Sequence, residues 1–129
     1  IWPVGKGSQT IPNLNQYGWE TRLTLFTGVA GGHPGNLPAT KTGISVSRVG
    51  ILITAFGKNP DGDGTILRLW EQAGISGSCT VKLGIGNSVK AVIPIDLRGN
   101  TIGKKISVNK GTFSFYLRKY APASFLLVY

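Results

Sequence analysis

The sequence predicts an all-β fold, an antiparallel β-sandwich of about eight or nine short strands. Three observations support this prediction. Short apolar runs alternate with turns rich in Gly, Pro and Asn along most of the chain. No long segment repeats its apolar residues with helical spacing. The 129 residues include 19 Gly and 7 Pro yet are 41% hydrophobic, so the chain is one domain, too apolar for disorder and too interrupted for long helices.

The first 43 residues are predicted to be the least regular part of this single domain, which spans residues 1–129. Residues 1–18 indicate an irregular opening segment, because Pro and Gly recur within it. Residues 19–27 alternate between apolar and polar side chains and predict a half-buried strand. Residues 28–43 hold five Gly and two Pro and predict a long loop, of a length that is usually functional or mobile.

The rest of the chain is predicted to form strand after strand, because short apolar runs are separated by tight turns such as 98–100 and 109–111. These strands are expected at 44–46, 49–56, 65–71, 78–85, 89–97, 106–108, 112–118 and 125–129. The alternation of side chains predicts an inward-facing set made of Leu67, Leu69, Val81, Leu83, Ile93, Ile95, Phe113, Phe115 and Leu127.

Residues 51–71 predict a β-hairpin with a long turn. The turn, Asn59–Gly64, contains Pro, Asp and Gly, which preset or permit the backbone angles of a chain reversal. In the second strand Arg68 and Trp70 share the face opposite the inward leucines. The Arg68 guanidinium can there lie against the Trp70 indole or reach across the sheet.

Catalytic and metal-binding residues are not predicted within this chain. A retaining glycosidase needs two carboxyl groups about 5 Å apart, and the one close acidic pair, Asp61 and Asp63, sits in a turn where both serve best as solvated turn formers. No His or Cys spacing suits zinc, and the acidic residues do not complete a calcium loop. The single cysteine, Cys79, is expected to be a buried, inert thiol, and it leaves the cellular compartment open.

The net charge of +9 comes from 14 Lys and Arg against 5 Asp and Glu. The cations are scattered singly, which favours solvated faces or docking on an acidic partner domain over a nucleic-acid groove. A basic nucleic-acid-binding β-barrel remains an alternative. So does a carbohydrate-binding module, in which exposed aromatic side chains stack on sugar rings; the candidates are Trp2, Tyr17, Trp19, Tyr116 and Tyr120. The apolar runs fall short of the roughly 20 residues that a membrane helix needs, so we expect a soluble domain.

The hairpin also resembles a known family. An apolar strand, a polar residue, a D-G-D-G turn and an I-L-R-L-x-E strand are similar to the hairpin in the C-terminal β-domains of α-mannosidases of glycoside hydrolase family 38. Residues 89–100 and 110–128 resemble later strands of those domains, so the likeness covers about 44–129. The chain departs from the family at residues 120–124, where the family often has an acidic residue followed by Thr or Lys.

The resemblance implies a non-catalytic C-terminal β-sandwich of an α-mannosidase-like enzyme, packed on the catalytic domain of the same polypeptide. In that family the catalytic aspartates and the zinc ligands belong to an N-terminal α/β domain, so any zinc would be bound there and no cofactor is expected here. A chain that begins with Ile and lacks Met also suggests a piece of a longer polypeptide. Because the turn is longer than closure requires, we hypothesise that Asp61, Asp63 or Arg68 borders the substrate pocket of the catalytic domain.

Overall fold

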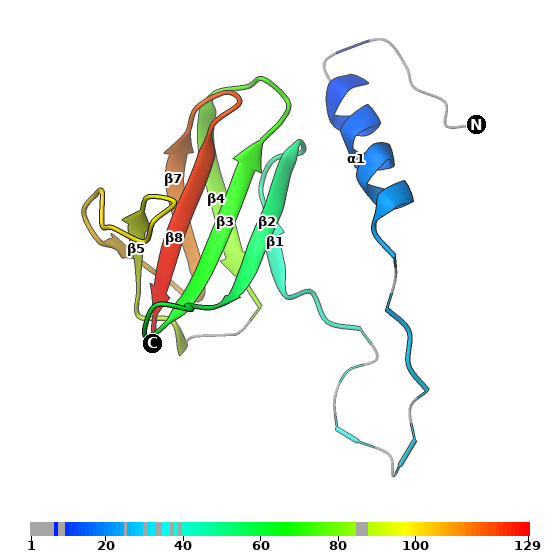
Figure 1. Cartoon of the computed structure of the whole chain (residues 1–129), viewed down its shortest axis with the longest axis horizontal. Coiled ribbons are helices and arrows are strands. Elements are labelled where there is room, and N and C mark those ends of the chain that lie inside the picture. Colours follow the sequence, from blue (N-terminus) through cyan, green and yellow to red (C-terminus); the bar gives the residue numbers. More distant parts are fainter. Residues whose placement is uncertain are drawn as a thin grey trace.

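The computed structural model describes residues 7, 10–24, 26–29, 31–32, 35–36, 38, 40–84 and 88–129. It shows two antiparallel sheets packed face to face, which confirms the predicted all-β sandwich (Figure 1). The three-stranded sheet has the order β1-β4-β7, with bounds β1 Ile44–Val46, β4 Gly77–Leu83 and β7 Thr112–Leu117. The five-stranded sheet has the order β2-β3-β8-β5-β6, with bounds β2 Ile51–Lys58, β3 Thr65–Glu71, β8 Pro122–Val128, β5 Ala91–Ile95 and β6 Ile106–Ser107.

Two predictions are wrong here, the irregular segment over residues 10–18 and the strand at 19–27, because residues 10–22 form the helix α1 (Thr10–Arg22). Pro12 lies in the first turn, where a missing N–H costs nothing. Nε2 of Gln16 donates to Oε1 of Glu20 at 2.7 Å, a contact between residues four apart that supports a helix. Trp19 and Leu23 are also four apart, so they share a helix face as readily as they fit a strand. The helix lies outside the sandwich, beside β1 and β2 (Figure 1).

The hairpin prediction is confirmed. β2 pairs antiparallel with β3 from Ile51 opposite Glu71 to Lys58 opposite Thr65, with a register shift between Ile53 and Ala55. The turn is closed by the N–H of Asn59, which donates to the carbonyl of Gly64 at 3.0 Å. β3 then pairs with β8 on its other side and so lies inside the five-stranded sheet.

The core lies between the two sheets, and most of the predicted inward residues are found there. Phe125 packs edge-on against Phe115, with ring centroids 4.6 Å apart, and joins the strands of both sheets. The core cluster consists of Leu67, Leu69, Cys79, Val81, Leu83, Val89, Val92, Phe113, Leu117, Phe125 and Leu127, with Phe115 packed against it.

The predicted faces of β5 are wrong. Val92 pairs with the core residue Leu127, whereas Ile93 pairs with Leu126 and Ile95 with Ser124 on the outer face. Ile95 is nevertheless buried, and Ile93 is half-buried. The alternation could not decide between the faces, because all of Ala91–Ile95 is apolar.

Three connections cross from one sheet to the other at the same end of the sandwich. They are residues 47–50 between β1 and β2, 72–76 between β3 and β4, and 118–121 between β7 and β8. Figure 1 shows all three at its upper edge, opposite the hairpin turn and the chain's C-terminal residue. In the described part of the chain, no helix is both long and apolar enough to cross a membrane.

Candidate functional site

A buried carboxylate organises the end of the sandwich where the connections cross. Oε1 of Glu71 accepts the backbone N–H groups of Ala73 at 3.0 Å and Ile75 at 3.2 Å. Its Oε2 accepts those of Gly74 at 2.9 Å and Tyr120 at 2.8 Å. Burial raises the pKa of Glu71, but these hydrogen bonds, with that of Tyr120 foremost, together hold it below its ordinary value. The carboxylate is therefore ionised, and the four backbone N–H groups stabilise its negative charge inside the fold.

Arg48 brings the third connection to the same carboxylate. Its Nη2 donates to the carbonyl of Ile75 at 2.7 Å and lies 3.7 Å from Oε1 of Glu71. The ion pair is longer than the amide hydrogen bonds, so those bonds make the larger contribution. We call Glu71, Arg48 and the four amides bound by Glu71 the Glu71 node. It ties together the three connections that cross between the sheets at this end of the sandwich.

The sequence contains one sign of this node that the predictions above did not include. Glu71 follows Leu67 and Leu69 at the same alternation and so shares their inward face. An acidic residue on an apolar face must be paired or hydrogen-bonded. The residues that satisfy it follow within four positions or lie 49 positions away, and no local pattern reveals the distant one.

Of the aromatic side chains predicted to contact sugars, the structure brings two together. Trp19 of α1 and Tyr120 of the last connection line one pocket of about 410 Å³ beside the Glu71 node, and Trp70, absent from the prediction, joins them there. Tyr116 is exposed on β7 and Tyr17 on α1, and neither lines this pocket. Trp2 lies outside the described residues.

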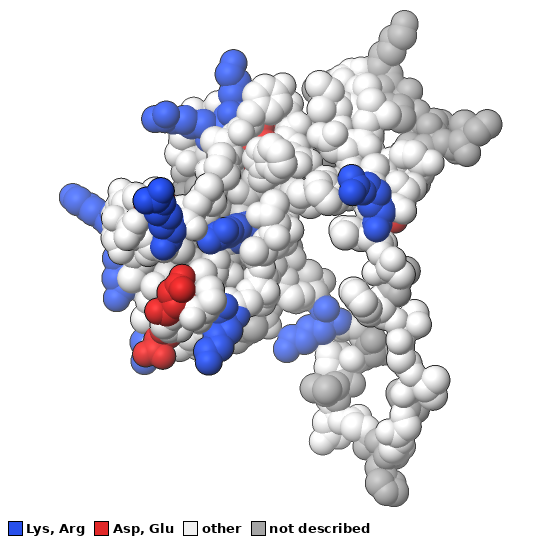
Figure 2. Space-filling view, in the orientation of Figure 1, with Lys and Arg blue, Asp and Glu red and all other residues white. Residues whose placement is uncertain are grey.

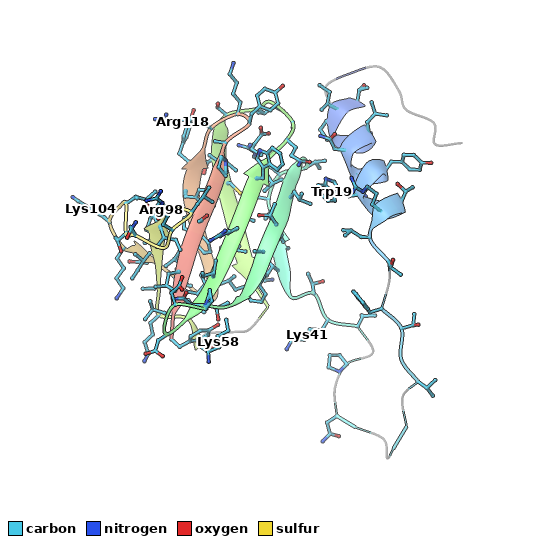
Figure 3. The ribbon with its side chains drawn as sticks, viewed as in Figure 1. Trp19, Lys41, Lys58, Arg98, Lys104 and Arg118 are labelled. Carbon is cyan, nitrogen blue, oxygen red and sulfur yellow. The ribbon has the colours of Figure 1, made fainter. Side chains whose placement is uncertain are left out.

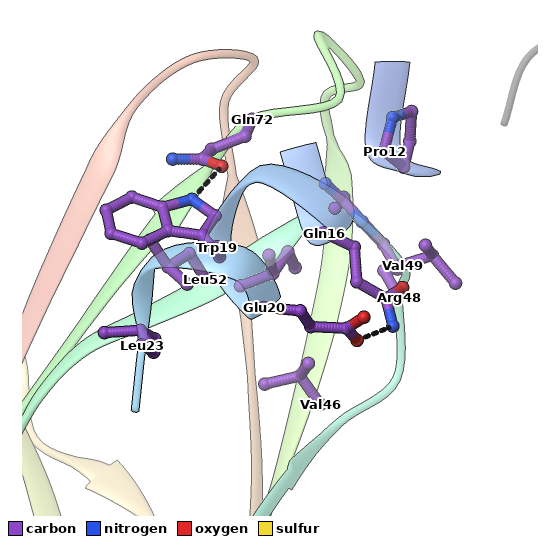
Figure 4. A pocket seen from close by; sticks show the side chains of 12 residues that line it. Pro12, Gln16, Trp19, Glu20, Leu23, Val46, Arg48, Val49, Leu52 and Gln72 are labelled. Carbon is purple, nitrogen blue, oxygen red and sulfur yellow. Dashed lines mark hydrogen bonds between the residues drawn. The ribbon is translucent and has the colours of Figure 1, made fainter. Parts of the chain in front are cut away.

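A second, larger hollow of about 780 Å³ lies between α1 and the edges of β1 and β2. Its walls are mostly apolar (Figure 4). Trp19 and Gln72 line both this hollow and the smaller pocket. α1 is held beside it by two hydrogen bonds to Gln72: Nδ2 of Asn15 donates to its carbonyl at 3.3 Å, and Nε1 of Trp19 donates to its Oε1 at 3.4 Å. Figure 3 shows Trp19 pointing from α1 toward the sandwich.

The hairpin turn lies at the opposite end. Asp61 and Asp63 are exposed, and the turn is braced from within because Oδ1 of Asn59 accepts the N–H of Asp61 at 3.1 Å. Gly64 has a φ of +94°, and a Cβ there would lie 2.7 Å from the carbonyl oxygen of Leu127. The turn therefore packs closely against the end of β8.

Arg68 lies on the outer face of the five-stranded sheet and reaches across it. Its Nη2 donates to the carbonyl of Leu97, beyond β5, at 3.1 Å, and its Nε is buried without a hydrogen-bond partner among the described residues. Trp70 instead donates its Nε1 to the carbonyl of Tyr120 at 3.2 Å. Arg68 and Lys58 line a shallow hollow of about 450 Å³ under the turn, and Asp61 and Asp63 are not part of its lining.

The cations of the described residues spread over several elements, as predicted. Figure 2 shows Lys and Arg side chains projecting from many points on one side of the molecule. Those labelled in Figure 3 lie on separate segments: Lys41 before β1, Lys58 at the end of β2, Arg98 and Lys104 after β5, and Arg118 after β7. This distribution of Lys and Arg does not test nucleic-acid binding, which stays an alternative function.

Asp96 and Cys79 also have shifted pKa values. Hydrogen bonds from Asn100, first of all from its side chain, hold the pKa of Asp96 below its ordinary value. Cys79 is fully buried, as predicted, and burial raises the pKa of its thiol. Across the described residues, no three His, Cys, Asp or Glu side chains are grouped so that they could hold a metal ion. The described residues therefore offer no set of ligands for a zinc ion.

Two antiparallel sheets that enclose one hydrophobic core define a β-sandwich domain. The model of the glycosyl hydrolases family 38 C-terminal beta sandwich domain matches residues 50–121, which is more than half of the chain. The chain therefore belongs to this family. The match begins in one crossing connection and ends in another, so it includes the hairpin and Glu71. No curated protein sequence and no solved structure matches the chain.

Proposed function

We propose that this chain is the non-catalytic C-terminal sandwich of an α-mannosidase-like glycoside hydrolase and packs on the catalytic domain of the same polypeptide. The observation that supports this most is the family match over residues 50–121. The acidic residues fit a non-catalytic role as well. Glu71 is committed to backbone amides and Asp96 to its own turn, while Asp61 and Asp63 are exposed on the hairpin.

The outer face of the five-stranded sheet is the surface we propose for this packing. Arg68 stands on it with a buried Nε that has no partner among the described residues, and Lys58 lines the same hollow. The Arg68 guanidinium and the Lys58 ammonium place positive charge at this hollow, which suits a carbonyl or carboxylate of a neighbouring domain. In this arrangement Arg68, Asp61 and Asp63 border the substrate pocket of the catalytic domain.

The test uses the complete enzyme that contains this chain. We expect Arg68→Ala, and separately the pair Asp61→Ala with Asp63→Ala, to lower kcat/KM for an aryl α-mannoside by about tenfold or more, equivalent to about 1.4 kcal/mol of transition-state stabilisation. Lys82→Ala is the matched control, because Lys82 is exposed on β4 in the other sheet. Unchanged kinetics in variants that melt at the wild-type temperature would reject a role for the hairpin in the pocket.

A further inference from the structure

We propose that the pocket beside the Glu71 node binds a neutral sugar ring. This site is separate from the hairpin turn and does not depend on how the domain packs on a catalytic domain. Its aromatic wall is built from three segments that are far apart in sequence: Trp19 comes from α1, Trp70 from the end of β3, and Tyr120 from the connection between β7 and β8. Trp70 is 44% exposed and Tyr120 is 60% exposed, so large aromatic surfaces face solvent at one place.

Tyr120 is fixed before any ligand arrives. Its backbone N–H donates to Glu71 and its carbonyl accepts from the Trp70 indole. Its φ of +56° lies in the left-handed region, which is uncommon for a residue other than Gly. A Cβ at Gly74 would meet the Tyr120 hydroxyl, so the ring lies directly on the Gly74 backbone. Strained residues that are held in this way concentrate at binding sites, and preorganised rings lose little entropy on binding.

The polar groups of the pocket suit hydroxyl groups. The hydrogen bonds from Asn15 and Trp19 to Gln72 leave Oδ1 of Asn15 and Nε2 of Gln72 without partners among the described residues. One accepts and the other donates, and a sugar hydroxyl can do both. The Glu71 carboxylate also lines the pocket, but its charge is taken up by the amides of the node.

These features decide between classes of ligand. An anion needs an unpaired cation in the lining, and no Lys or Arg lines this pocket. A wholly apolar peptide side chain would leave the Gln72 and Asn15 amide groups unsatisfied. A pyranose satisfies both requirements, because its C–H face packs on an aromatic ring while its hydroxyls reach the amides. The volume of about 410 Å³ is within the usual range for small-molecule sites.

The experiment is a titration of the chain, followed by NMR of the tryptophan indole N–H groups. The probes are methyl α-mannoside, an α-linked mannotriose, methyl β-glucoside, and a short apolar peptide as the competing class. We expect saturable shifts of two of the indole signals with at least one sugar, with a Kd on the order of 1 mM for a single ring. We expect no saturable shift with the peptide.

Two variants localise the binding. Tyr120→Gly removes the ring, and glycine readily adopts the positive φ of this position. Trp19→Ala alters α1, a helix outside the sandwich in which Pro12 is the buried residue. Both variants should therefore still fold. Each should weaken sugar binding at least tenfold, whereas Tyr116→Ala, at an aromatic residue that is 69% exposed on β7, should not. The proposal is overturned if no sugar saturates the indole shifts, if Tyr116→Ala weakens binding as much as Trp19→Ala does, or if the peptide is preferred. None of these results bears on the kinetics proposed for the hairpin, so the two proposals fail separately.

Discussion

Glu71 and Tyr120 lie 49 residues apart in the sequence, yet the backbone N–H of Tyr120 donates to Oε2 of Glu71 at 2.8 Å. Through this bond the strand that ends the hairpin holds the connection that leads to the last strand. The same carboxylate also fixes the connection to β4. One buried side chain therefore determines how both sheets meet at this end of the sandwich, and it positions an exposed aromatic ring.

Replacing Glu71 with Gln tests the contribution of the node to stability. The amide keeps the shape of the carboxylate but loses the charge and points an NH₂ group at backbone N–H donors. We expect a loss of about 3 kcal/mol in the free energy of unfolding, because two of the four buried N–H donors lose their acceptor and Arg48 loses its ion pair. Urea titration measures this loss. Asp96→Asn, in an exposed turn, is the control and should cost much less.

The pH dependence of stability should follow from the same carboxylate. The pKa of Glu71 is lower in the folded state than its ordinary value of about 4.3, so below that pH the unfolded chain binds more protons. Stability should be level from about pH 5 to 8 and should fall as the pH drops from about 4.3 through the folded pKa. Asp96 shifts in the same direction. Unfolding measured at several acidic pH values should show a shallower decline in Glu71→Gln than in the wild-type chain, and equal slopes would contradict the assignment.

Gly74 tests the contact on which Tyr120 rests. Its φ of +76° disfavours any side chain, and an added Cβ would collide with the Tyr120 hydroxyl. Gly74→Ala should therefore cost about 1–3 kcal/mol, through left-handed strain and through displacement of the ring. Gly31 provides the comparison, since a Cβ there meets nothing within 4 Å. The melting temperatures of the two variants measure this difference. If Gly74→Ala were as stable as Gly31→Ala, the Tyr120 ring would move aside without cost.

Leu69 tests the inward face of the hairpin. It is 1% exposed within the core cluster, so Leu69→Ala should destabilise the domain by about 2–5 kcal/mol. Leu97 is 63% exposed, and Leu97→Ala should change stability by less than about 0.5 kcal/mol. A cost below about 0.5 kcal/mol for Leu69→Ala in denaturant titration would mean that this face does not carry the core.

The hairpin could be predicted from the sequence because its information is local. The turn residues and the alternation of β3 are both contained in about twenty residues, and the predicted strand 65–71 has the observed bounds. α1 could not be separated from a strand, because residues four apart in a helix can also fit an alternating pattern when some positions are ambiguous. The faces of β5 depend on which residue meets Leu127, and that pairing joins positions distant in sequence.

The aromatic pocket could not be predicted either, because it also depends on contacts between residues distant in sequence. Trp19 and Tyr120 could be named as exposed aromatic residues, but their proximity depends on α1 and on a connection about a hundred residues later. Trp70 was placed correctly opposite the inward leucines, where the Arg68 guanidinium was expected either to lie against its indole or to reach across the sheet. Arg68 reaches across, to the carbonyl of Leu97. The Trp70 indole bonds the carbonyl of Tyr120, because the node brings that connection within reach.

The Glu71 node has a consequence for how the native chain opens. Amides in connecting segments ordinarily exchange their hydrogens with solvent quickly, since local fraying exposes them. The amides of Gly74 and Tyr120 are bound to a carboxylate that cannot leave its buried position unless β3 separates from the core. These two loop amides should therefore exchange as slowly as those in the centre of β3, and they report the opening of the whole sandwich rather than the motion of the connections that contain them.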